Sequence, residues 1–225
     1  MGLPERIGTT ILDSVDKAVD VRWDQAKALA STTSGPIDAR IAQVRRAFAR
    51  ELAVLGAAAG GAAALPGAGT ATVVATTAAD LGWFTMRSAD LILTIAAIHG
   101  HTEASVEQRK AWVLSILAFG DGAASGFTKL SGELGKGLGG KLTQRIPASG
   151  LARINRVVGR TIVTKYGGKR GAIALGRALP FGIGAAIGGS ANYASTLLIA
   201  KQADRFFSDL PPVLDATSTL KVDAG

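Results

Sequence analysis

An apolar stretch near the middle of the chain contains three ionisable residues, Asp80, Arg87 and Asp90. Charged side chains inside an apolar helix cost free energy unless they pair with one another or serve a site. Spacings of seven and three residues place all three on one face of a helix. We therefore expect a buried ion triad, and the alternative is a proton-transfer or ligand-binding site.

Two histidines, His99 and His101, follow that stretch on either side of Gly100. Residues two positions apart do not share a helical face, and a metal ion would need further ligands beside them. A glycine just past a helix is a common C-cap. We therefore expect both histidines to have capping or loop roles, and the sequence predicts no metal site and no cofactor.

One glycine-rich stretch, 135–142, approximates the phosphate loop G-x-x-x-x-G-K of nucleotide-binding proteins. Leu142 occupies the position at which Ser or Thr would bind Mg²⁺, and we expect no strand before the loop. The chain also has no G-x-S-x-G elbow and no H-E-x-x-H helix. We therefore predict no catalytic residues. The enzymatic alternative is a helical hydrolase or lipid-modifying enzyme that uses Asp80, Arg87 and a histidine.

Basic residues gather in the segment 129–177, which has eleven Lys or Arg and one Glu, while the rest of the chain sums to −2. Within it, 150–165 has an apolar face and an arginine face, which predicts a basic amphipathic helix. Such a segment is attracted to anionic membrane surfaces, and the alternative is a basic surface that serves solubility. Tyr166 is the only aromatic residue between Phe127 and Phe181, so we do not expect nucleic acid as a partner. The candidate anion-binding residues are Lys141, Arg145, Arg153, Arg156, Arg160, Lys165, Lys169 and Arg170.

The composition excludes several classes of protein. The 225 residues include 29 Gly and no Cys, 48% are hydrophobic, and 19% are charged. This balance excludes intrinsic disorder, and the lack of Cys excludes a disulfide scaffold, a Cys-ligated metal and thiol catalysis. The length suits one domain, which we place at 1–209, with a flexible tail at 210–225.

Two stretches without charged residues, 52–79 and 178–200, are long enough to cross a bilayer. Pro66 interrupts the first, which predicts a helical hairpin that is either buried or re-entrant. Polar and small residues dilute the second, which favours a core helix over a spanning helix. Its Gly184 and Gly188 form a small-xxx-small face for close helix packing, and its Asn192 is a candidate buried polar residue.

Apolar residues that recur every three or four positions predict helices along most of the chain. Glycines crowd the stretch 120–140, which predicts a mobile connection. The predicted fold class is all-α: a single Ala/Gly-rich helical bundle with a central helical hairpin and the basic amphipathic helix. The expected helices span 4–30, 37–55 and on into the first uncharged stretch, 70–99, 106–119, 150–165 and 181–209.

Four blocks of sequence resemble the EcsC family of bacterial proteins. They are AAAGGAAALPGAGT at 57–70, TAADL at 77–81, IAAIHG at 95–100 and LPFGIGAAIGGSAN at 179–192, in the family's order over 37–207. The resemblance implies a helical fold and membrane association, linked to an ABC transporter and to secretion. It implies no biochemical activity and no catalytic residues.

Together these observations predict a non-enzymatic protein that binds anionic membrane surfaces through its basic segment. The first residues include no apolar stretch of signal-peptide length, so we expect a cytoplasmic protein at the inner face of the cell membrane. The resemblance adds a membrane transporter as an expected partner. The alternatives are the enzyme described above and a membrane-inserting protein, either integral or pore-forming.

Overall fold

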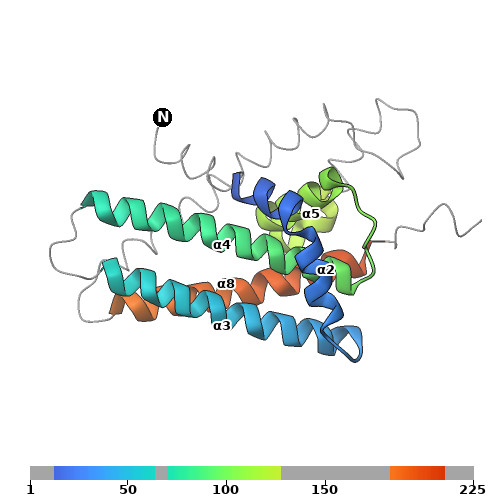
Figure 1. Ribbon diagram of the computed structural model, residues 1–225, viewed down its shortest axis with the longest axis horizontal. Helices are drawn as coiled ribbons and strands as arrows, with labels where there is room; N and C mark the ends of the chain where they lie inside the picture. The colour runs from blue at the N-terminus through green and yellow to red at the C-terminus, as the bar shows by residue number, and fades with distance from the viewer. Residues whose placement is uncertain (1–12, 64–69, 128–182, 211–225) are drawn as a thin grey trace, which may run out of the picture.

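The computed structural model describes residues 13–63, 70–127 and 183–210 (Figure 1). These residues are mostly helical and include no strand, which confirms the predicted all-α fold. The predicted helix over 150–165 and the loop over 135–142 lie outside the described residues. So do all the candidate anion-binding residues from Lys141 to Arg170.

Three long helices form the body of the protein: α3 (Ile37–Ala63), α4 (Thr70–Ile98) and α8 (Ile183–Ser208). Figure 1 shows them side by side along most of their length. Because α3 ends and α4 begins on either side of Pro66, the predicted helical hairpin is confirmed.

Shorter helices cover one end of this body. α2 (Trp23–Ser31) packs against α4, and α5 (Val106–Phe119) continues into the 3-10 helix η1 (Gly120–Gly122) beside α8. Residues of α4 such as Leu91, Ile92 and Leu93 are fully buried among these helices. Within the described part of the chain, residues 81–98 of α4 form the one helix long and apolar enough to cross a membrane, and most of that stretch is buried inside the protein.

Local hydrogen bonding explains the bounds of α5, which match the prediction. The Ser105 side chain accepts a hydrogen bond from the Gln108 backbone, and the Gln108 side chain accepts one from the Ser105 backbone. Gly100, at φ 88°, ends α4 in the left-handed conformation that glycine favours. Residues 123–127 are helical, and the rest of the predicted glycine-rich connection lies outside the described residues.

The first predicted helix differs from the structure. We expected one helix over 4–30, but the helix over 13–21 is interrupted at Arg22, and α2 begins at Trp23. Arg22 has φ −106° and ψ 6°, outside helical values. Val19 and Ala26, which lie on either side of the interruption, are both buried. Both segments therefore pack on the body, with a charged residue at the joint.

The closest helix packing joins α3 to α8. A Cβ added to Gly56 would lie 2.5 Å from the Gly188 carbonyl oxygen and 2.5 Å from the Asn192 side-chain nitrogen. Asn192 is buried, and its Nδ2 donates to the Leu52 carbonyl at 3.1 Å. Gly188 thus makes the predicted close approach, while the side-chain surroundings of Gly184 lie outside the described residues.

Replacement of Gly56 by Ala should force α3 and α8 apart, because backbone and a buried amide occupy the space that the new methyl needs. We expect Gly56→Ala to lower the free energy of unfolding by about 1–3 kcal/mol in urea denaturation. Gly122→Ala is the matched control, because its added Cβ would meet nothing closer than 3.9 Å. Equal stabilities of the two variants would contradict the close approach.

Candidate functional site

The most concentrated group of charges in the described residues lies where α3, α4 and the N-terminal segment meet. On α4, Arg87 Nη1 donates to Asp90 Oδ2 at 2.6 Å, one helical turn away. The predicted pairing of these two residues is therefore present. The side chain of Asp80, the third member of the expected triad, lies outside the described residues.

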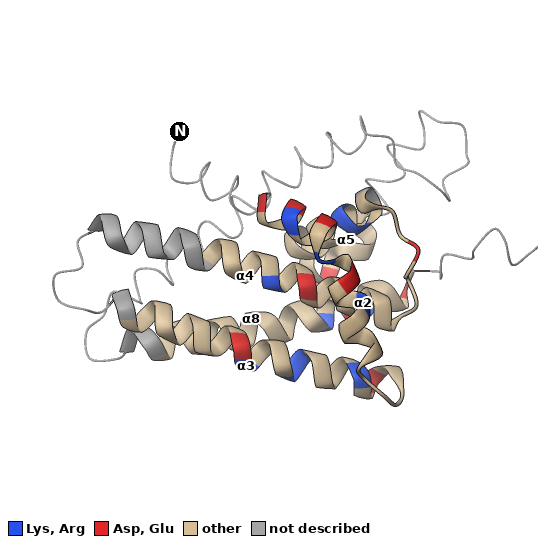
Figure 2. Ribbon diagram, viewed as in Figure 1, with Lys and Arg blue, Asp and Glu red and all other residues tan. Residues whose placement is uncertain are grey.

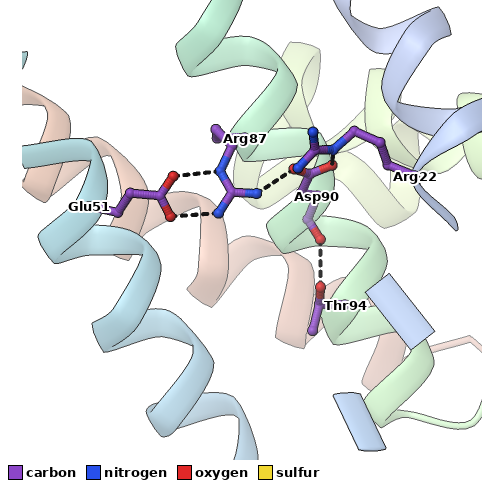
Figure 3. A network of polar contacts seen from close by, with 5 residues as sticks. All are labelled: Arg22, Glu51, Arg87, Asp90 and Thr94. Atoms are coloured by element: carbon purple, nitrogen blue, oxygen red, sulfur yellow. Dashed lines mark hydrogen bonds and ion pairs between the residues drawn. The ribbon is translucent and has the colours of Figure 1, made fainter. Parts of the chain in front are cut away.

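Two further partners come from other helices (Figure 3). Arg87 forms a two-pronged contact with Glu51 of α3, with Nε to Oε1 at 2.7 Å and Nη2 to Oε2 at 2.5 Å. Arg22, at the interruption before α2, reaches Asp90 through Nε at 2.9 Å and Nη2 at 2.7 Å. We call these four residues the ion network.

Sequence reasoning missed Arg22 and Glu51. They lie 68 and 36 residues from their partners, so no local spacing links them. One signal was available for Arg22: it falls on the buried, core-facing stripe of the first helical segments, at helical spacing from its neighbours. The other members of that stripe are Val15, Val19, Ala26 and Ala30.

Burial sets the energetics of the ion network. The Asp90 side chain is only 7% exposed, whereas that of Glu51 is 38% exposed. Burial by itself lowers the pKa of Arg87, but hydrogen bonds to Glu51 and Asp90 and the charges of both outweigh it and raise that pKa. The Arg87 guanidinium also lies 4.5 Å from the ring centre of Phe48, a cation–π contact.

The ion network is built to join helices and not to transfer protons. Both oxygens of Asp90 and both oxygens of Glu51 accept hydrogen bonds from a guanidinium. A general base needs an oxygen directed at a substrate proton. Two arginines and two carboxylates also compensate each other, so the network holds its helices together without net charge.

The histidines lie at the end of α4 and connect it to α8 and α5. His99 Nε2 lies 3.0 Å from Asp204 Oδ1 on α8. His101 is buried between the rings of Trp112 and Phe207, with ring centres 5.6 and 5.5 Å away. Its Nδ1 has no hydrogen-bond partner in the described part of the protein. The residues thus follow the helix end as predicted, and they also contact two neighbouring helices.

Burial lowers the pKa of His101, and the nearby ring of His99 lowers it further, although a hydrogen bond with the Phe207 backbone opposes both effects. The described residues contain no group of three His, Cys, Asp or Glu side chains placed to hold a metal ion.

Asp90 should be the most sensitive member of the ion network. Asp90→Asn leaves two arginines facing each other without their shared carboxylate, so we expect the free energy of unfolding to fall by about 3 kcal/mol. Asp24→Asn is the matched control, since the Asp24 side chain is 92% exposed and its pair with Lys27 contributes about 0.5 kcal/mol or less. Chemical denaturation of both variants measures the difference. A small effect of Asp90→Asn would show that the network does not hold the helices.

The low pKa of His101 predicts acid sensitivity. In the unfolded chain its pKa is close to 6.5, and in the folded protein it is lower, so the unfolded state binds the proton first. Its contribution to stability is complete above pH 6.5 and is lost as the pH falls from there toward the folded value. Thermal unfolding across this range should show a smaller loss in His101→Gln than in the wild type. Parallel profiles would contradict this assignment.

The candidate residues therefore separate into three places: the ion network at Arg87 and Asp90, the α4–α8 contact at His99, and the α3–α8 contact at Asn192. No protein-family model, curated protein or solved structure matches this chain.

Proposed function

We propose that the protein is a peripheral membrane protein that binds anionic lipid surfaces through the segment 129–177. The observation that carries this proposal is the separation of charge along the chain. The described residues include twelve basic and thirteen acidic side chains, a net charge of −1. The segment 129–177 has eleven basic residues and one acid, a net charge of +10.

Pairing within the described helices supports this assignment. Besides the ion network, Lys110 pairs with Asp16, and Arg205 pairs with Asp121 at 3.6 Å. Cations that already have acidic neighbours add little attraction to an anionic surface. The excess charge of 129–177 has one acid in its own sequence, and each Lys or Arg near an acidic leaflet contributes about 1 kcal/mol.

The connections of the segment make it an effective anchor. It follows Phe127, whose ring packs on Phe206 near the C-terminal end of α8, and it leads to Ile183 at the other end of the same helix. These points are about 35 Å apart along α8. Because both ends of the segment join the same body, lipid bound along it brings the whole bundle to the membrane.

The EcsC resemblance extends the proposal to a role beside a membrane transporter or in secretion, at the cytoplasmic face of the membrane. The enzymatic alternative gains no support from the ion network, since its carboxylate oxygens already accept guanidinium hydrogen bonds.

Flotation with liposomes tests the proposal. Protein purified without detergent should float with vesicles of phosphatidylcholine and phosphatidylglycerol at low salt, and high salt or phosphatidylcholine alone should abolish flotation. Reversal of Arg153, Arg156 and Arg160 to Glu should weaken binding at least about a hundredfold.

The control reverses three exposed basic residues of the described helices, Lys17, Arg46 and Lys201, to Glu, which changes the net charge by the same amount. This control variant should float as the wild type does. Equal binding by the wild type and the Arg153, Arg156 and Arg160 variant would overturn the proposed role of the segment.

A further inference from the structure

The charges of the three long helices lie toward one end of the bundle, as Figure 2 shows for the residues it colours. Toward the other end, residues 52–63 of α3 and 183–192 of α8 contain no charged residue, and residues 70–86 of α4 contain one, Asp80. We call these three stretches the uncharged end.

Printed contacts between the helices fix how the three stretches align. Asn192 bonds the Leu52 carbonyl, and Arg87 bonds Glu51, so residues 192 of α8 and 87 of α4 lie level with residues 51–52 of α3. From that level α3 continues for twelve residues to Ala63. At 1.5 Å per residue, the uncharged end is about 18 Å deep.

A large exposed side chain lies at the boundary of the uncharged end on each helix. These are Val54 on α3, Trp83 on α4 and Tyr193 on α8, with 69%, 44% and 41% of their surfaces exposed. The alignment places them within about 6 Å of one another along the bundle axis. We call them the girdle. Trp and Tyr are the residues enriched at membrane interfaces, where an apolar ring and a polar atom meet lipid and water.

We infer that the uncharged end inserts into one leaflet of an anionic bilayer, with the girdle at the interface. This inference rests on the proposed function, because the basic segment supplies the attraction to anionic lipid. The hydrocarbon core is about 30 Å thick, so a depth of about 18 Å enters one leaflet and does not cross both. The charged half of the bundle, including the ion network, stays in water.

The basic segment is connected in a way that suits this orientation. Its last basic residue, Arg177, is six residues from Ile183, where α8 begins at the tip of the uncharged end. Six extended residues span up to about 20 Å. The chain can therefore return from the tip to the headgroups, so Arg177 and the girdle can meet the same interface.

Trp83 is a natural probe, because the other two tryptophans, Trp23 and Trp112, are buried. Full-length protein would be mixed with phosphatidylcholine and phosphatidylglycerol vesicles whose acyl chains carry bromine either near the headgroup or near the methyl end. We expect quenching that is stronger with the shallow bromines and that disappears in Trp83→Phe. Stronger quenching by the deep bromines would overturn insertion into a single leaflet with the girdle at the interface.

A pair of variants on α3 tests depth independently. Ala58 and Ala47 are both exposed and are eleven residues apart, which is three turns, so they share a helix face. Ala58→Asp places a carboxylate within the uncharged end, and Ala47→Asp places it in the charged half. We expect Ala58→Asp to weaken vesicle binding at least about tenfold and Ala47→Asp to leave it unchanged, with equal thermal stability of both variants.

The outcomes separate this inference from the proposed function. Flotation without Trp83 quenching, or equal binding by the two Asp variants, would overturn insertion and leave surface binding intact. Quenching that persists with brominated phosphatidylcholine alone and at high salt would support insertion and overturn charge-driven binding. Protein that floats with no vesicle would overturn both. A dimer in sedimentation that Ala58→Asp converts to a monomer would assign the uncharged end to a second copy and overturn insertion.

Discussion

The described structure depends on compensation of the charge of Asp90. This carboxylate is almost fully buried, and it accepts hydrogen bonds from Arg87 on its own helix and from Arg22 on the N-terminal segment. A buried charge without a partner costs several kcal/mol, so both arginines must be in place. Arg87 in turn holds Glu51. One buried carboxylate thereby fixes α3, α4 and the N-terminal segment relative to one another.

The opposite face of α3 uses a different device. At Gly56, hydrogen-bonded amide and backbone of α8 occupy the space where a side chain would stand, so van der Waals contact replaces ionic pairing. Each mechanism suits its place along the bundle. Ion pairs join the helices where charged residues occur, and small residues join them where the sequence has none. The bundle therefore has two chemically different ends within one continuous set of helices.

This division agrees with the proposed membrane role. Electrostatic attraction to anionic lipid is screened by salt and holds a protein only loosely, and a short apolar insertion is also weak by itself. Stable yet reversible attachment generally uses two such signals together. The basic segment would supply the first signal and the uncharged end the second, and the connection from Arg177 to Ile183 places the two next to each other in the chain.

The sequence by itself determined the local features of this protein: the bounds of α5, the end of α4 at Gly100, the helical hairpin and the pairing of Arg87 with Asp90. Each depends on residues a few positions apart, whose hydrogen bonds or spacing can be read along the chain. Only the tertiary structure decided the partners of Asp90 and Arg87 on other helices, the interruption at Arg22 and the contact of His99 with Asp204. Such contacts join residues 36 to 105 positions apart. They exist only because particular helices pack together, and that packing follows from the summed burial of whole helical faces, which no local spacing encodes.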